Sequence, residues 1–206
     1  MFVQDHLGNQ SILVTGTSRP YDRIANRAAR MVAFTLVGNG FSLVTGNAPG
    51  VDKTVSSSYC FELARVGGIA GLGYTQLRLP WFSRGSLLPI RSYRASSEMT
   101  VRLKNRQDWL EEARARADAV VMLGGRKGAL SIVNRFIDSG KPVFPVPFTG
   151  GQSNEVFREI LRNWCDNPVP GLSRSQSFAW RFPGHPALAR WQTCCWEPCR
   201  SIRMSS

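Results

Sequence analysis

One local pattern occurs three times in this chain: an apolar run of strand length leads into a glycine-containing loop, and a helical period follows. The apolar runs and glycine loops of the three copies lie at residues 11–19, 41–50 and 117–128. In an open α/β sheet, the loops that leave the carboxyl ends of parallel strands converge on one crevice. The repeated pattern therefore predicts one shared site for a nucleotide-like ligand.

The other strand and helix signals alternate with this pattern. Apolar runs predict strands over 12–15, 43–45, 75–79, 117–123 and 141–147, and helical periods predict helices over 24–36, 51–65, 97–115, 129–138 and 154–164. This alternation predicts a Rossmann-like α/β fold with a mainly parallel sheet and helices on both faces. Three prolines in or beside 141–147 predict an edge strand or a very short strand there.

The length of 206 residues suits one α/β domain with a proper core. We expect a lead-in over 1–10, a ligand-binding domain over 11–163, and an irregular tail or small appendage over 164–206, where the period is lost. No apolar run approaches the roughly 20 residues that cross a bilayer, and no secretory signal pattern opens the chain. These features predict a cytoplasmic protein without a membrane partner.

The cysteines and the charge narrow the chemistry further. Five cysteines at irregular spacing predict reduced thiols, and the spacing of Cys194, Cys195 and Cys199 fits no standard zinc site, so we expect no metal. The net charge of +12 attracts anions of any kind. Arg102 and Arg106 lie four residues apart on the predicted helix over 97–115 and so would share a face. That face suits either a phosphate-rich ligand or an acidic partner, or it is simply solvated.

The candidate ligand-binding residues come from the glycine loops and the segments beside them. Backbone N–H groups and hydroxyls of the first loop would donate to a phosphate that Arg19 grips, and glycines let a diphosphate approach the backbone. Asp52 either accepts a hydrogen bond from a ribose hydroxyl or caps its helix. The alternative is that the loops are ordinary tight turns. The full set is Gly16, Thr17, Ser18, Arg19, Gly46, Asn47, Gly50, Val51, Asp52, Arg102, Arg106, Gly124, Gly125, Arg126, Lys127, Gly128, Thr149 and Gly150.

Taken together, the motifs at 14–19, 43–52, 117–128 and 140–143 resemble the SLOG superfamily of Rossmann-like nucleotide-ligand domains. Gly-Lys-Pro-Val at 140–143, followed by Pro-Phe-Thr-Gly-Gly at 147–151, is most similar to the sensor branch found beside TIR and sirtuin domains. The resemblance implies binding of an NAD- or ADP-ribose-derived nucleotide, such as a cyclic ADP-ribose isomer, without a further cofactor. It also implies signalling in bacterial anti-phage defence, as a homo-oligomer that acts on a separate effector protein.

Two other functions fit the same superfamily. Lonely Guy enzymes hydrolyse the N-glycosidic bond of nucleotides with a glutamate that follows a Gly-Gly-x-Gly-Thr loop. Here Ala129 replaces the threonine, and residues 131–134 hold no acid, so we expect a binding protein and not an enzyme. Single-stranded DNA binding of the Smf/DprA type is the other alternative, and it rests on the net charge and on the basic residues between 76 and 106.

Overall fold

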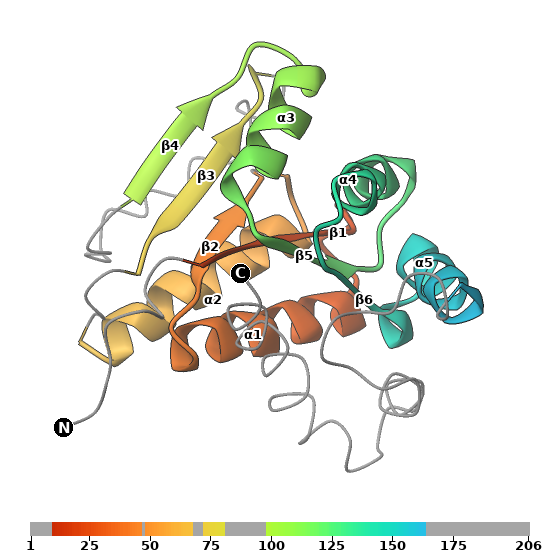
Figure 1. Ribbon diagram of the computed structural model, residues 1–206. Coiled ribbons are helices and arrows are strands. Elements are labelled where there is room, and N and C mark those ends of the chain that lie inside the picture. The colour runs from red at the N-terminus through yellow and green to blue at the C-terminus, as the bar shows by residue number, and fades with distance from the viewer. Residues whose placement is uncertain (1–9, 47, 68–71, 81–97, 164–206) are drawn as a thin grey trace, which may run out of the picture.

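The computed structural model describes residues 10–46, 48–67, 72–80 and 98–163 (Figure 1). Six strands form one sheet in the order β4-β3-β2-β1-β5-β6, and every pair of neighbouring strands is parallel. The strands are β1 (Ser11–Gly16), β2 (Ser42–Thr45), β3 (Tyr74–Arg78), β4 (Glu98–Arg102), β5 (Ala119–Leu123) and β6 (Val143–Val146). The predicted α/β fold is confirmed, and the parallel pairing extends to all six strands.

Five α-helices and a short 3-10 turn complete the described part of the chain. The helices are α1 (Arg23–Gly38), α2 (Val51–Arg65), α3 (Arg106–Arg116), α4 (Lys127–Asp138) and α5 (Gly151–Arg162), and the 3-10 turn is η2 (Pro147–Thr149). Among the described residues, no helix has the length and apolar character needed to cross a bilayer. Residues 1–9 of the predicted lead-in and the predicted tail over 164–206 lie outside the described residues.

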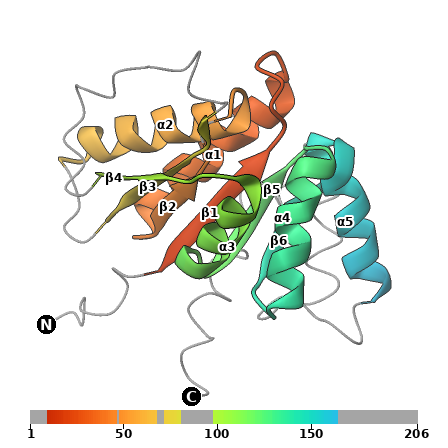
Figure 2. The same cartoon turned by 90° about the horizontal axis from the view of Figure 1, so that it is seen from above.

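Helices cover both faces of the sheet, as predicted (Figures 1 and 2). Side chains of α1 and α2 pack on one face in a cluster that includes Ile12 and Val14 of β1. Side chains of α3 and α4 pack on the other face, around Leu13 of the same strand. The alternation along β1 explains its run of three apolar residues, Ile12, Leu13 and Val14, because a parallel strand buried on both faces has no polar side.

The strand order reverses between β1 and β5. The chain moves outward from β1 through β2 and β3 to β4, then returns to the other side of β1 to form β5 and β6. In open α/β sheets, such a switch point leaves a crevice beyond the carboxyl ends of the two central strands. The loops after β1 and β5 therefore border the position where a ligand is expected.

The predicted helix over 97–115 is wrong in its first half. Residues Glu98–Arg102 form β4, which pairs with β3, and α3 begins only at Arg106. The Asn105 side chain accepts a hydrogen bond from the Asp108 N–H at 2.9 Å and so sets the start of α3. Arg102 and Arg106 consequently lie on a strand and on a helix, and they do not share a helical face.

Two smaller differences concern the exposure of one side chain and the start of one helix. Ile24, which was expected to belong to the apolar stripe of α1, is 59% exposed. The final helix begins at Gly151 and not at residue 154. The prediction for 141–147 is confirmed, because β6 is short and lies at the edge of the sheet.

Candidate functional site

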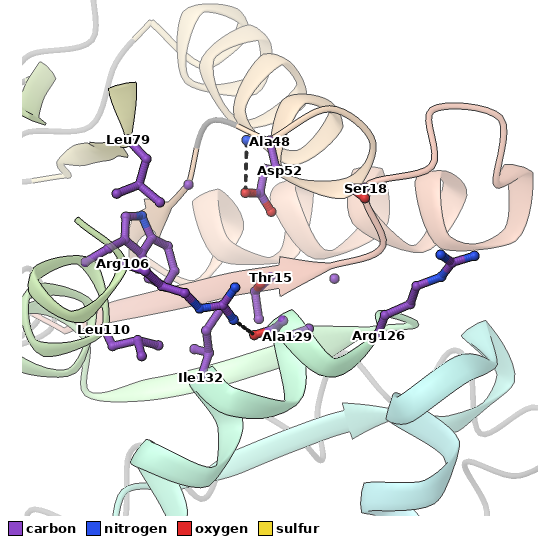
Figure 3. Close-up of a pocket in the computed structure, with 14 residues that line it drawn as sticks. Thr15, Ser18, Ala48, Asp52, Leu79, Arg106, Leu110, Arg126, Ala129 and Ile132 are labelled. Carbon is purple, nitrogen blue, oxygen red and sulfur yellow. Dashed lines mark hydrogen bonds between the residues drawn. The ribbon is translucent and has the colours of Figure 1, made fainter. Parts of the chain in front are cut away.

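A pocket of about 230 Å³ lies at the carboxyl edge of the sheet, where the loops after β1, β2 and β5 meet the start of α3 (Figure 3). The three glycine loops thus share one pocket, as their positions in the sequence predicted. Its lining residues are Thr15, Gly16, Ser18, Gly46, Ala48, Asp52, Leu79, Arg106, Trp109, Leu110, Arg126, Gly128, Ala129 and Ile132.

Asp52 supplies the carboxyl group of the pocket. It lies in the first turn of α2, is only 8% exposed, and accepts a hydrogen bond from the Ala48 N–H at 3.3 Å. Burial raises the pKa of Asp52 to about 7, and the bond from Ala48 partly opposes that shift. Among the described residues, this is the one hydrogen bond that the carboxyl accepts. A ligand that donates further hydrogen bonds to this buried group would stabilise it.

Gly46 makes room for this carboxyl. A Cβ atom at Gly46 would lie 2.4 Å from Asp52 Oδ2 and 3.4 Å from the indole ring of Trp109. Any larger residue at 46 would push the carboxyl or the indole out of place. Of the two roles expected for Asp52, the capping role is not seen, since no side chain caps the start of α2 and Gly50 occupies the N-cap position.

The start of α4 forms the second polar part of the pocket. No side chain caps this helix and no acid lies in its first turn, so the first N–H groups of α4 have no partner within the helix. Gly128 and Ala129 of that turn line the pocket, and Arg126 lies at the same end of it as Ser18 (Figure 3). N–H groups and a helix dipole directed at one place favour an anion.

Arg106 crosses from α3 to α4 over the pocket. Its Nη2 atom donates a hydrogen bond to the Gly128 carbonyl at 3.1 Å (Figure 3). The guanidinium is exposed and retains donors for another group. Arg106 therefore both ties the two helix starts together and adds positive charge to the pocket.

An apolar wall closes the pocket at the end away from Arg126. Leu79, Trp109, Leu110 and Ile132 form this wall, and all four are buried. The Trp109 indole donates a hydrogen bond from Nε1 to the Leu77 carbonyl at 3.1 Å, which fixes the ring. A flat apolar group such as a nucleobase could pack against this wall.

Much of the glycine loop after β5 has a structural role. The Gly124 N–H donates to Thr149 Oγ1 at 2.7 Å, and Thr149 Oγ1 donates to the Val146 carbonyl at 2.5 Å. The carbonyls of Gly124 and Gly125 accept hydrogen bonds from the N–H groups of Ser153 and Gln152 at the start of α5. The loop therefore caps α5, and the N–H of Gly124 is already used within the protein.

The loop after β1 is bound to its neighbours in the same way. The Thr17 N–H donates to the Leu123 carbonyl, the Thr17 carbonyl accepts from the Val51 N–H, and Thr17 Oγ1 accepts from the Arg19 N–H. Gly50 has φ of +82°, and a Cβ there would lie 2.4 Å from the Thr17 carbonyl oxygen. The backbones of these loops are in direct contact, which requires glycine at Gly50.

The structure brings together part of the predicted set. Gly16, Ser18, Gly46, Asp52, Arg106, Arg126 and Gly128 line the pocket. Two groups of the predicted residues do not line it. The residues of the loops that lie behind or beside the pocket are Thr17, Gly50, Val51, Gly124, Gly125, Thr149 and Gly150. The residues that are exposed outside it are Arg19, Arg102 and Lys127. Asn47 lies outside the described residues.

The apolar wall and three small lining residues, Thr15, Ala48 and Ala129, are absent from the set predicted from the sequence. Trp109, Leu110 and Ile132 have the helical spacing of ordinary core residues, so their pattern alone does not distinguish a pocket wall from a core. The position of Trp109 three residues after Arg106 is the one local signal that could have identified them, since it places both on one face of a helix.

Within the described residues, no group of three His, Cys, Asp or Glu side chains is placed to hold a metal ion. The cysteines weighed for zinc lie in the undescribed residues, and the described Cys60 is a buried free thiol. The chemistry that the described pocket offers is therefore one carboxyl group, helix N–H groups and arginine side chains.

No protein-family model matches the chain, and no curated protein matches its sequence. Among solved structures, the X-ray structure of TM1055, a structural genomics target, has a TM-score of 0.56 at 21% identity, over 72% of this chain and 81% of that chain. The molybdenum cofactor carrier protein from Chlamydomonas reinhardtii has a TM-score of 0.49 at 16% identity, over 66% of this chain and 74% of that chain.

A third similar structure is that of DNA processing protein A from Helicobacter pylori, which was described for its single-stranded DNA binding mode. Its TM-score is 0.48 at 17% identity, over 75% of each chain. Of these three structures, only TM1055 has a TM-score above 0.5, and at 21% identity this similarity shows a shared fold and nothing more. The chain therefore shares a Rossmann-like α/β fold with TM1055.

Proposed function

We propose that the pocket binds a small nucleotide-derived ligand of the NAD or ADP-ribose class. The observation that carries this proposal is the pairing, in one pocket, of the buried Asp52 carboxyl with the uncapped start of α4. A ribosyl phosphate supplies hydroxyl donors for the carboxyl and an anion for the helix start. Its base supplies a flat apolar surface for the wall that contains Trp109.

The size of the pocket indicates how much of a ligand it encloses. Its volume of about 230 Å³ is below the roughly 300 to 1,000 Å³ of pockets that enclose a drug-sized molecule. A ligand with two nucleoside parts would therefore place one part in the pocket. The remainder would extend past Ser18 and Arg126 toward solvent.

We infer that the chain is a sensor and that a separate effector protein receives its signal. The segment in which a Lonely Guy enzyme carries its glutamate holds no acid here, and Ser131 Oγ in that segment donates to the Lys127 carbonyl at 2.9 Å. The resemblance to the sensor branch supports a homo-oligomer that acts in anti-phage signalling in the cytoplasm. The ligand would then be bound and not consumed.

Calorimetry and a thermal-shift screen with AMP, NAD, ADP-ribose and cyclic ADP-ribose test this proposal. A ligand at 100 times its dissociation constant stabilises the protein by about 2.7 kcal/mol. Arg126→Ala should weaken binding about tenfold through loss of a charge-assisted contact. Lys127→Ala is the matched control, because Lys127 is the next residue and is exposed outside the pocket. No shift with any of the four compounds, or equal loss in both variants, would contradict the proposal.

A second function is favoured by Asp52 itself. A carboxyl with a pKa of about 7 inside the pocket can exchange a proton near neutral pH, as hydrolysis of an N-glycosidic bond requires. Chromatography for free base after incubation with nucleoside monophosphates tests this function. If the unaltered chain releases free base and the Asp52→Asn variant does not, the protein is a hydrolase and not a sensor. If the nucleotide stays unchanged, the sensor function is retained.

A further inference from the structure

The outer surface of the α1 and α2 layer differs from the rest of the described surface. Both helices cover the same face of the sheet and lie side by side in both views (Figures 1 and 2). Of the seven large apolar side chains that are exposed among the described residues, five belong to this layer or its ends. They are Tyr21, Ile24, Phe34, Phe61 and Val66.

Three arginines lie among these apolar side chains. Arg23, Arg27 and Arg30 are exposed and follow one another at spacings of four and three residues, so they form one stripe along α1. Phe34 continues that stripe by four residues. Helix α1 contains no acidic residue, and none of these three arginines forms an ion pair with any residue that the structure describes.

Helix α2 adds to the same surface. Lys53 and Phe61 are exposed on it, and the exposed Arg65 is paired with Glu62 of the same helix. On α1, the N-cap residue Asp22 accepts a hydrogen bond from the Ala25 N–H. The described outer face of the two helices therefore carries both basic and bulky apolar side chains. The two described acids beside them, Asp22 and Glu62, are already bonded.

The charge limits what can cover this surface. A second copy of the chain would bring two arginine stripes of the same charge into one interface, and the described residues of this face add no free acid between them. A single-stranded nucleic acid would use the arginines and the aromatic rings, but Ile24 and Val66 offer no ring on which a base can stack. An anionic lipid surface uses every member of the set, because headgroups attract the arginines and the interface accepts both aromatic and aliphatic side chains.

We propose that the outer face of α1 and α2 docks on an anionic membrane surface. The arginine stripe lies along the headgroups, and Tyr21, Ile24, Phe34 and Phe61 enter the interface between headgroups and acyl chains. The expectation of no membrane partner rested on the absence of a long apolar run. That absence bears on crossing a bilayer and not on lying against one.

Co-sedimentation of the full chain with vesicles tests the proposal. Vesicles of equal parts phosphatidylserine and phosphatidylcholine should bind the chain, and vesicles of phosphatidylcholine alone should not. Changing Arg23, Arg27 and Arg30 together to Gln should lower binding about 100-fold, since each arginine near such a surface contributes roughly a fivefold factor. Raising the salt concentration should weaken binding of the unaltered chain.

A matched control changes three other exposed basic residues, Lys104, Arg158 and Arg162, to Gln. This control removes the same charge and should retain most of the binding. Ile24→Ser with Phe34→Ser should lower binding while the arginines remain. The thermal shift with ADP-ribose, measured on the arginine variant, distinguishes membrane docking from ligand binding. It should be unchanged, because the arginine stripe does not line the pocket.

Three outcomes would overturn the proposal. They are equal binding to neutral vesicles, equal loss in the arginine variant and the control variant, and binding of a labelled oligothymidylate through the same arginines without binding to the anionic vesicles. The last outcome would assign the surface to single-stranded nucleic acid.

Discussion

The loop after β2 and the loop after β5 look alike in sequence but have different roles in the structure. After β5, the N–H of Gly124 and the carbonyls of Gly124 and Gly125 are bonded within the protein, and only the helix start beyond them faces the pocket. After β2, Gly46 lies at the pocket and leaves space for a buried carboxyl. Glycine in such loops therefore indicates close approach, and the approaching group can be another backbone segment as well as a ligand.

The largest effect should come from a substitution where the loops touch. Gly50→Ala places a Cβ against the Thr17 carbonyl at a backbone conformation that only glycine adopts easily. We expect a loss of roughly 3 to 5 kcal/mol in the free energy of unfolding, measured by chemical denaturation. Gly38→Ala is the control, because a Cβ at Gly38 meets nothing within 4 Å and Gly38 lies in α1. Its expected effect is a gain of up to about 1 kcal/mol, and equal effects of the two variants would contradict the contact.

Asp52→Asn should have the next largest effect, and its sign depends on pH. The folded protein holds a proton on Asp52 up to a pKa of about 7, whereas the ordinary pKa of an aspartate is 3.8. The unfolded chain therefore loses this proton first as pH rises, and stability falls between about pH 4 and pH 7. Asp52→Asn removes this dependence and should raise stability by roughly 2 to 4 kcal/mol at pH 8.

Thermal denaturation at pH 8 and pH 4 measures the effect of Asp52→Asn. The gain should be small at pH 4, where the carboxyl is protonated in the folded state. Asp138→Asn is the control, because Asp138 is exposed at the end of α4. A gain that is the same at both pH values would mean that burial of the charged form is not its cause.

Thr149→Val addresses the loop after β5 and should cost about 1 to 3 kcal/mol. It leaves the buried Gly124 N–H without an acceptor and removes the donor to Val146. Thr149→Ser keeps the hydroxyl and should recover most of the stability. Ligand affinity should change little in either variant if this loop mainly braces α5, and a large loss of affinity would mean that the loop binds the ligand directly.

Arg106→Ala should have the smallest effect on stability, below about 1 kcal/mol, because its bond to Gly128 is exposed. Its effect on ligand affinity should be larger, since the guanidinium lines the pocket. Calorimetry of ligand binding beside denaturation of the same variant separates the two effects. A stability loss of several kcal/mol would instead identify Arg106 as a structural link between α3 and α4.

The sequence predicted the parts of this molecule that depend on local pattern. The bounds of α2 and the convergence of the three loops follow from apolar period and glycine position alone. The strand β4 was mistaken for helix because its pairing with β3 is a contact between distant segments, which local propensity does not encode.

The pocket was only partly predictable for a similar reason. Asp52 and Arg126 lie within or just after the glycine loops, so they belong to the predicted set, and both line the pocket. Trp109 and Leu110 were missed because a pocket wall and a core have the same helical spacing. The bracing role of Thr149 depends on a hydrogen bond across 25 residues of chain, and no local signal marks it.

The hydrogen bonds from the start of α5 to the glycine loop fix one end of that helix. Its first N–H groups donate to the carbonyls of Gly124 and Gly125, and its 12 residues extend about 18 Å from there. Leu161, near the other end, is buried in the same apolar cluster as Val14 of β1. The helix is therefore held at both ends, by backbone hydrogen bonds beside the pocket and by core packing remote from it.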